Sequence, residues 1–506
     1  MKGLIRLLSS GKVLGVLALI VNLIIMYACD FYWHFYAYHL ITLGIAFLLL
    51  IYHIVRGENM THIIFCFVVT ATLPLLGFVF SRFLGNKKCN SRQIKAWKDI
   101  YYNSSSYITQ DEEVLKELKQ DSKGAYKQTR YVLSVSNRPV YQDNQVKYFG
   151  NTVEFFNEYI ESLKGAKKYI FIELFSIRDS ELWTAIFDVI RVKAREGVDV
   201  KLIYDYAGCK RGFKDSQYFE KLFNHGLEAI PFNKPTKVPS RMNKYRTHRK
   251  FTVIDGVTAF HCGSNVSDYY YNENPWKDCG LKITGSAVWN YMVTFLEDYT
   301  YSTKKTVKLK DYELKEYPTT KTKTKDYVQP FIVDPIQTTS PEKKMILSAI
   351  NNAQESLDIV APYMVLDDEI LSALKMASRS GVKISVVVPD AATKKKLFYI
   401  SRSYYADLIR SGIRIYSYKT TYLHTKFVVC DKETAMVSSM NLDYRPMYTH
   451  FSDGVLIHKG TALDGINKDF EDMKGASHEI TIKEMSKRSV IEKLVASIYR
   501  LFVPLT

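Results

Sequence analysis

The stretch RTHRKFTVIDG, residues 246–256, carries the first sign of how this 506-residue chain folds and what it does. It alternates like a buried strand, yet it places His248 and Lys250 two positions apart, with Asp255 five positions further on. Side chains two residues apart point to the same face of a strand, about 7 Å from each other. An ordinary core strand has no use for two ionisable groups on one face, so the pattern indicates a functional site.

The same pattern recurs in YLHTKFVVCDK, residues 422–432, where His424, Lys426 and Asp431 keep identical spacing. The neighbouring segments repeat as well. REGVDVKLIYD corresponds to RSGVKISVVVPD, and NHGLEAIPF corresponds to RSGIRIYSY, in the same order along the chain. A chance match of one short pattern would not bring its neighbours with it. The chain therefore contains one strand–helix–strand unit twice.

The duplication predicts an α/β fold of two sandwich units related by pseudo-two-fold symmetry, with the site between them. The expected organisation is an apolar membrane anchor over 1–85, a connecting segment over 86–164, a first unit over 165–300, a Lys/Thr-rich linker over 301–340, a second unit over 341–475 and a C-terminal amphipathic helix over 476–506. The linker reads as solvated, with a lipid-headgroup contact as the alternative. The C-terminal helix is expected to pack on the core, with a position on anionic lipid as the alternative.

A formal charge of +17, from 69 Lys plus Arg against 52 Asp plus Glu, suits an anionic partner such as nucleic acid or an acidic membrane. Three apolar runs without Asp, Glu, Lys or Arg, at 13–29, 37–55 and 63–80, favour the membrane. Each is about long enough to span a bilayer core. A cleaved signal peptide is the alternative for the first run.

Basic residues flank these runs so that the amino terminus and the catalytic part are both expected inside, which requires an even number of spans. We therefore predict a first run lying in the interface, a membrane hairpin from the other two, and a cytoplasmic-facing catalytic region. The seven cysteines include no CxxC pair, which gives structural zinc no support and fits a reducing compartment.

Two histidines facing each other, with a lysine beside each, suit an anion with a breakable ester bond. One imidazole attacks phosphorus, the other protonates the departing alkoxide, and the lysines stabilise charge on the non-bridging oxygens. Asn265, Ser439 and Asn441, in the small-residue turns CGSN and SSMN, are expected to donate to the same oxygens. Asp255 and Asp431 either orient an imidazole or terminate the strand. With no metal-binding cluster in the sequence, we predict metal-independent chemistry without a cofactor.

The tandem HxKx4D motifs resemble the phospholipase D superfamily. WKDCGLKITG, SRSYYADLI and APYMVLDDEILSALK are further similar to bacterial cardiolipin synthases of the phospholipase D type, from about residue 40 to the end. The resemblance implies transfer of a phosphatidyl group between two phosphatidylglycerols, with release of glycerol, through a phosphatidyl-histidine. It implies His248 as nucleophile and His424 as acid/base, although the pseudo-symmetry leaves the opposite assignment open. In that family the motif aspartates are thought to support the histidines indirectly.

The chain departs from that family at three positions: Cys262 replaces a glycine, and Pro446 and Ser452 stand where a serine and a glutamate are expected. Losing the glutamate leaves an altered rate or acceptor preference open. The expected partners are phosphatidylglycerol, cardiolipin and an anionic membrane, and no nucleic acid. The sequence does not predict an oligomeric state.

Other residues carry weaker signals. Glu173 ends a strand near the expected site, with a water-facing acid as the alternative. Arg246 and Asn243 are candidates for phosphate binding, with a plain surface position as the alternative. Residues 276–280, WKDCG, are expected to pack under the first motif as structural residues. Arg402, Tyr404 and Tyr405 are expected to line an acyl-chain entrance, or else to be an ordinary helix start.

Rival functions remain. A hydrolytic phospholipase D and another phosphatidyltransferase would use the same motifs. A nucleic-acid phosphodiesterase is disfavoured by the apolar runs and by the lack of an aromatic stacking platform. A membrane-anchored scaffold with an inactive site is disfavoured because His248, Lys250, His424 and Lys426 are all intact.

Overall fold

The computed structural model describes residues 19–25, 27–28, 35–55, 60–77, 91–142, 144–215, 217–234, 245–317, 326–335, 341–391, 393–443 and 450–501. The chain divides into two compact units, of which the first holds Met1–Lys88, Thr236–Pro239 and Ile498–Thr506 and the second holds Cys89–Pro235 and Ser240–Ser497. Both repeated halves of the sequence lie in the second unit.

In the first unit, the apolar helices α3 (Phe35–Val55) and α4 (Met60–Thr72) pack against each other. Apolar side chains point outward from α3, where Leu40 is 70 % exposed and Leu48 is 68 % exposed. Among the described residues, no helix is both long enough and apolar enough to cross a membrane. The spans predicted over 37–55 and 63–80 are therefore not confirmed. Much of the first predicted run lies outside the described residues.

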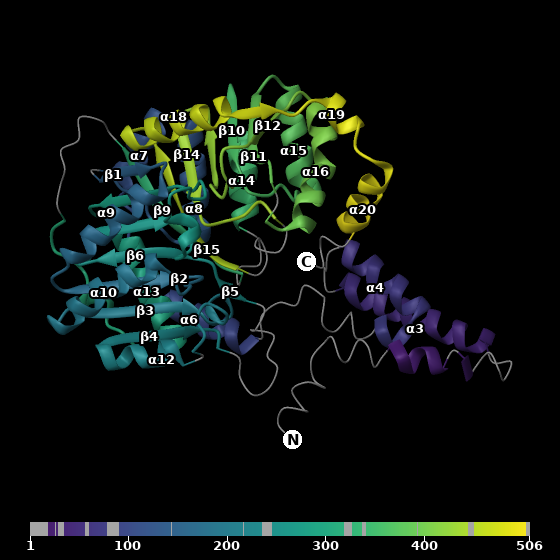
Figure 1. Ribbon diagram of the computed structural model, residues 1–506, viewed down its shortest axis with the longest axis horizontal. Helices are drawn as coiled ribbons and strands as arrows, with labels where there is room; N and C mark the ends of the chain where they lie inside the picture. Colours follow the sequence, from purple (N-terminus) through teal and green to yellow (C-terminus); the bar gives the residue numbers. More distant parts are fainter. Residues whose placement is uncertain are drawn as a thin grey trace. The chain divides into compact units, whose positions relative to one another are not determined.

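The second unit is built on two sheets, one for each half of the repeat (Figure 1). The first sheet has the order β1-β8-β7-β6-β2-β3-β4, from β1 (Gln145–Phe149), β2 (Tyr169–Leu174), β3 (Asp199–Asp205), β4 (Leu227–Phe232), β6 (Lys250–Ile254), β7 (Thr258–Cys262) and β8 (Gly280–Thr284). The second has the order β16-β12-β11-β10-β13-β14-β15-β5, with β9 paired to β15. Its strands are β5 (Arg246–Thr247), β9 (Tyr327–Val333), β10 (Ser356–Val360), β11 (Lys383–Pro389), β12 (Arg414–Tyr418), β13 (Phe427–Cys430), β14 (Thr434–Ser438), β15 (His450–His458) and β16 (Ser477–Glu479).

The two sheets share one topology. Strands β2, β3 and β4 are parallel, as are β10, β11 and β12. Each motif strand, β6 or β13, lies antiparallel to the first of these and starts an antiparallel run. The duplication predicted from the sequence is therefore confirmed in the order of the strands.

Helices cover both faces of each sheet. Helices α9 (Thr152–Lys164) and α10 (Glu181–Arg195) cover one face of the first sheet, and α13 (Val288–Thr303) covers the other. Helices α14 (Pro341–Asn352) and α15 (Asp368–Arg379) cover one face of the second sheet, and α18 (Thr461–Gly475) covers the other. Further helices with described bounds are α6 (Ser91–Ser105), α7 (Glu112–Asp121), α8 (Lys123–Ser136), α11 (Tyr206–Cys209), α12 (Tyr218–Lys221), α16 (Lys395–Arg410), α19 (Ile482–Ser486) and α20 (Val490–Leu501). One apolar core runs from α13 across both sheets to α18.

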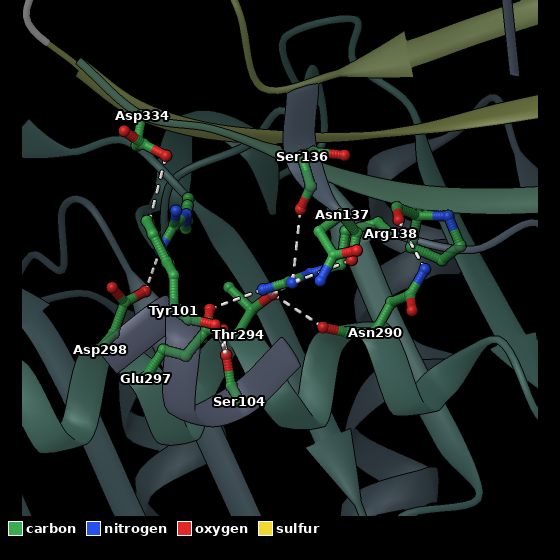
Figure 2. Close-up of polar contacts among 12 residues, drawn as sticks. Tyr101, Ser104, Ser136, Asn137, Arg138, Asn290, Thr294, Glu297, Asp298 and Asp334 are labelled. Atoms are coloured by element: carbon green, nitrogen blue, oxygen red, sulfur yellow. Dashed lines mark hydrogen bonds and ion pairs between the residues drawn. The ribbon is translucent and has the colours of Figure 1, made fainter. Parts of the chain in front are cut away.

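A buried polar network fixes the segment before the first half onto α13 (Figure 2). The Arg138 guanidinium donates to the Glu297 carboxylate at 2.6 Å and to the Thr294 hydroxyl at 3.2 Å. Ser104 on α6 donates to the other Glu297 oxygen at 2.5 Å. Arg138 and Glu297 are 2 % and 3 % exposed, so each supplies the charge that makes burial of the other tolerable.

Each sheet also receives a strand from outside the predicted bounds of its half. Strand β1 and helix α9 fall in the predicted connecting segment but belong to the first sandwich, because β1 pairs with β8. Strand β9 falls in the predicted linker but pairs with β15 along its length. In the chain, β1 precedes β2 and β9 precedes β10, the apolar strand with which each half of the repeat begins. The repeat pattern therefore did not include these two strands.

The C-terminal helix also differs from the prediction. The helix was expected to pack on the core, but in α20 Ile491 is 74 % exposed and Leu494 is 59 % exposed. The helix instead presents an apolar face at the surface.

Candidate active site

Each motif histidine lies where the chain of one half pairs with the other half. Strand β5 joins the second sheet beside β15, and the His248 amide donates to the Phe451 carbonyl at 2.7 Å. In the other direction, the His424 amide donates to the Lys277 carbonyl, also at 2.7 Å. This reciprocal pairing brings both histidines to the junction of the two halves.

The two motif lysines are buried at the same junction. Lys250 is 1 % exposed and Lys426 is 3 % exposed. The Lys250 ammonium donates to the His248 carbonyl at 2.6 Å, and the Lys426 ammonium donates to the His424 carbonyl. Burial, reinforced by Lys426, lowers the pKa of Lys250 to about 7, and burial also lowers the pKa of Lys426. Because the charge of Lys426 acts on Lys250, a bound anion would relieve the repulsion between these two desolvated ammonium groups.

The His248 ring is oriented by a peptide carbonyl. Its Nδ1 lies 2.9 Å from the carbonyl oxygen of Ser439. Because a carbonyl only accepts, Nδ1 carries the proton and Nε2 keeps its lone pair. Phe175 and His450 flank the ring, with centroid distances of 4.7 Å and 5.2 Å. Burial and the charge of Lys250 hold the pKa of His248 well below its usual value, which favours the neutral ring.

The His424 ring is oriented by a carboxylate. Its Nδ1 lies 2.7 Å from Asp278 Oδ2, and Tyr270 Oη is 3.1 Å from the same nitrogen. Burial and Lys426 lower the pKa of His424 to about 4, against the opposing effect of Asp278. Asp278 is fully buried; burial favours its neutral form, but Lys426 and His424 still keep its pKa below the usual value. A bound anion would add to the carboxylate in stabilising an imidazolium here.

The two imidazoles thus have unlike partners, and the strand register gives the reason. It pairs Cys262 with Gly280 in the first sheet and Ser438 with Gly454 in the second. Counting back two residues from each glycine makes Asp278 and Ser452 equivalent. The second half therefore has a buried serine where the first has the carboxylate, and His248 contacts a backbone carbonyl instead.

Each motif aspartate directly follows its motif strand, β6 or β13. Asp255 adopts a left-handed φ of 52° and accepts hydrogen bonds from the amides of residues 167, 168 and 169 at 2.8, 2.7 and 3.0 Å. Asp431 has the same φ and accepts from the amides of residues 354, 355 and 356. Of the two roles left open by the sequence, the contacts match the structural one: each carboxylate ties its motif strand to the start of the neighbouring strand.

Three predicted substrate-binding residues follow the motif strands. Asn265 and Asn441 have buried Oδ1 atoms without a hydrogen-bond partner among the described residues. The Ser439 hydroxyl is 3.2 Å from the Asp453 carbonyl and 3.1 Å from the Asp453 amide. It is therefore already engaged, and Ser439 reaches the site through its carbonyl.

Glu173 and Arg246 make contacts next to the first motif. Glu173 is completely buried, so the water-facing alternative is wrong, and it accepts a hydrogen bond from the hydroxyl of Thr247. Burial, reinforced by Asp298, holds the pKa of Glu173 well above its usual value. The Arg246 guanidinium lies 3.8 Å from the Asp205 carboxylate. Asn243 and Pro446 lie outside the described residues.

Sequence reasoning missed Asp278, His450 and Tyr270. Residues 276–280 were expected to be structural, whereas Asp278 contacts the second motif's histidine. The repeat held this signal, because aligning DCGLKIT (278–284) with SDGVLIH (452–458) places Asp278 opposite the position of the expected glutamate. Tyr404 and Tyr405 are 2 % and 3 % exposed on α16 and do not line an open entrance.

The departure at Cys262 adds a buried thiol beside this site. Burial raises its pKa to about 12, so it is an unreactive thiol rather than a nucleophile. Within the described ranges, no group of three or more His, Cys, Asp or Glu side chains is placed to hold a metal ion.

A family model described as the PLD-like domain of cardiolipin synthase matches residues 159–294 and 346–474, that is, both halves of the repeat. The chain belongs to this phospholipase D-like family. A cardiolipin synthase of Alkalihalophilus pseudofirmus is 30 % identical over 450 residues, covering 87 % of this chain and 88 % of that protein. Cardiolipin synthase 2 of Bacillus cereus is 34 % identical over 365 residues, covering 70 % and 69 %.

A solved structure supports the fold. The phosphatidylserine synthase of Haemophilus influenzae superposes with a TM-score of 0.58 at 18 % identity, covering 74 % of this chain and 97 % of that one. In this phospholipase D-like chain, the matched regions contain both histidines, both lysines and Asp278.

Proposed function

We propose that this chain is a cardiolipin synthase, which transfers a phosphatidyl group from one phosphatidylglycerol to another and releases glycerol. The observation that carries the proposal is a pair of HxK motifs with buried lysines, one from each half, whose imidazoles have different partners. Family membership supports the substrate class, and the unlike partners support the assignment of roles.

In the first step His248 is the nucleophile. Its Nε2 lone pair attacks the phosphorus of phosphatidylglycerol, a P–N bond forms, and the P–O bond to the headgroup glycerol breaks. His424 is neutral in the empty site and takes up a proton when the anionic substrate binds. Held by Asp278, it then gives that proton to the departing glycerol oxygen. Lys250 and Lys426 stabilise the added charge on the non-bridging oxygens.

The second step reverses the proton transfer. Neutral His424 takes the proton from the terminal hydroxyl of a second phosphatidylglycerol, whose oxygen attacks phosphorus as the P–N bond to His248 breaks. The product is cardiolipin, and both histidines return to their starting states. No nucleotide is consumed, because the P–N intermediate conserves the energy of the phosphodiester.

The protein is proposed to act at a membrane with its catalytic unit on the cytoplasmic side. The exposed apolar side chains of α3 and of α20 support this attachment, since patches of this kind rarely face water. The charge of +17 favours anionic lipids such as the substrate.

A phosphatidyl donor whose leaving group needs no protonation distinguishes the roles of the two histidines. Phosphatidyl-p-nitrophenol has a leaving group that departs without protonation, so His424→Ala should release one equivalent of p-nitrophenol and retain the phosphatidyl label on His248. His248→Ala should release none. If the His248→Ala protein instead retains the label on His424, the assignment is reversed. If the wild-type enzyme forms only phosphatidic acid from phosphatidylglycerol, it is a hydrolase.

A further inference from the structure

A pocket beside each motif lysine is repeated in the two halves. The first-half pocket is lined by Phe155, Phe156, Tyr159, Leu174, Lys250, Phe251, Thr252, Phe260, Cys262 and Val266. The second-half pocket is lined by Glu342, Ile346, Val360, Ala361, Lys426, Phe427, Val428, Met436, Ser438, Met440, Asn441 and Leu442. Equal spacing from the motif histidine makes Lys250 equivalent to Lys426 and Cys262 equivalent to Ser438. In each pocket the cavity volume is about 20 Å³, room for one or two hydroxyl-sized groups rather than for a whole headgroup.

One position makes the two pockets chemically different. Asp255 and Asp431 bind the amides of Tyr169 and Ser356 in the same way, which makes those two residues equivalent. Fourteen residues earlier stand Phe155 in the first half and Glu342 in the second. The first pocket is therefore closed by an aromatic ring, whereas the second carries a carboxyl group.

Among the described residues, Glu342 is a buried side chain without a hydrogen-bond partner. Its exposed fraction is 0 %, and neither carboxylate oxygen has a hydrogen-bond partner among the described residues. The amide oxygen of Asn441, in the same pocket, is likewise unsatisfied within the described ranges. A buried polar group without a partner is costly, so a native structure that keeps two in one pocket points to a ligand.

The charges around the pocket select the ligand. Lys426 in its lining disfavours a second cation, so an ammonium headgroup is a poor match. Burial, with the carboxyl of Asp443 nearby, holds the pKa of Glu342 well above its usual value, so the side chain is a neutral acid. A neutral carboxylic acid both donates and accepts, and Asn441 Oδ1 accepts. Uncharged hydroxyl groups satisfy both side chains.

We propose that the second-half pocket binds the free hydroxyls of the glycerol headgroup, with Glu342 and Asn441 as specificity-determining residues. The proposal rests on the proposed function, because it places at Lys426 first the leaving glycerol and then the glycerol of the acceptor lipid. The pocket next to Lys250 has no equivalent pair of groups. The two halves therefore share the catalytic motif, and only the second selects the alcohol.

The test lets two acceptor alcohols, phosphatidylglycerol and ethanol, compete for the same phosphatidyl-enzyme. Labelled phosphatidylglycerol is supplied with ethanol, and the ratio of cardiolipin to phosphatidylethanol is measured in detergent–lipid micelles. Both products form from the same phosphatidyl-enzyme, so the ratio reports acceptor selection independently of the first step. Ethanol lacks the extra hydroxyls that Glu342 would bind.

Glu342→Leu should lower the ratio about tenfold, the effect of losing one hydrogen bond, and Glu342→Gln should keep it within about threefold because its amide still donates and accepts. Phe155→Leu, the matched control in the other half, should leave it unchanged. Glu342→Leu should melt no lower than wild type, since it removes an unsatisfied buried group.

An unchanged ratio in Glu342→Leu would overturn the inference, as would an equal fall in Phe155→Leu. A fall in Glu342→Gln as large as in Glu342→Leu would overturn the neutral-acid role. Failure of the wild-type protein to make either product would instead refute the proposed function, so the two failures are distinguishable.

Discussion

His424 and Asp278 come from opposite halves of the chain, yet the imidazole Nδ1 and the carboxylate oxygen are 2.7 Å apart. The equivalent position in the other half is Ser452, and His248 contacts the carbonyl of Ser439 instead. A duplicated site would give both histidines equal basicity if it had stayed symmetric. Among the described residues, of these two rings only that of His424 contacts a carboxylate, and this asymmetry is the basis of the proposed division into nucleophile and acid/base.

Removing the charge of Asp278 tests this division. Asp278→Asn keeps the size of the side chain but removes the negative charge that stabilises protonated His424. We expect cardiolipin formation to fall about 100-fold, the size of a general-acid contribution, while release of p-nitrophenol from the activated donor falls far less. Initial rates with the two donors measure both effects.

The matched control is Ser452→Ala at the equivalent position. The Ser452 hydroxyl has no hydrogen-bond partner among the described residues, so this variant should keep its rate within about threefold. Equal losses with both donors in Asp278→Asn would mean that the residue only maintains structure, and the assignment of His424 as the acid would be withdrawn.

The sequence predicted the parts of this site that lie within one strand. The HxK spacing fixes His248 and Lys250 relative to each other because a strand has a period of two. The repeated neighbours predicted two sheets of the same order, and the strand pairing confirms it. The small-residue turns with Asn265 and Asn441 were found because they follow their motifs directly.

Contacts between the halves could not be predicted in the same way. Asp278 and His424 are 146 residues apart, and nothing local to either residue specifies which histidine meets which acid. Glu342 was passed over because an acid in the first turn of a helix is usually a solvated residue that favours the helix dipole. Only the packing of α14 on the second sheet buries it.

The motif aspartates should matter for stability rather than for turnover. Asp255→Ala leaves the amides of residues 167–169 without their acceptor and puts alanine at a left-handed φ of 52°. We expect a loss of about 2–3 kcal/mol in the free energy of unfolding and near-normal activity per folded molecule. Denaturant titration and active-site counting with the activated donor measure the two quantities.

Asp255→Asn provides the comparison, because asparagine tolerates the left-handed conformation and still accepts through Oδ1. It should lose less stability than the alanine variant. Asp431→Ala should behave like Asp255→Ala, since its three backbone contacts are equivalent. A folded Asp255→Ala protein with turnover reduced 100-fold would show that the carboxylate serves the chemistry.

Catalysis should not require a metal ion. Lys250 and Lys426 supply the positive charge that divalent cations supply in many phosphoryl-transfer enzymes. Dialysis against excess chelator should leave cardiolipin formation within about twofold of the untreated enzyme, and Lys426→Met should lower the rate by at least about 100-fold. Restoration of a chelator-inactivated enzyme by Mg²⁺ or Mn²⁺ would contradict this expectation.

Binding of an anion should weaken as the pH rises through neutrality. With a pKa of about 7, Lys250 is charged below that pH and loses its proton above it, so the site loses positive charge on going from acid to base. Inhibition by tungstate, whose own charge is constant in this range, should weaken about tenfold between about pH 6 and pH 8. The lowered pKa of Lys426 acts in the same direction.

The stability of the fold depends on pH in the opposite direction to anion binding. Between pH 7 and the ordinary lysine range the unfolded chain binds a proton that buried Lys250 does not, so this group makes unfolding less favourable as the pH rises. Lowering the pH should therefore strengthen tungstate binding. In the absence of tungstate, lowering the pH should lower the melting temperature of the protein. Lys250→Arg, which stays charged throughout, should bind tungstate with little dependence on pH. A wild-type inhibition constant that is flat from pH 6 to 8 would rule out Lys250 as the titrating cation.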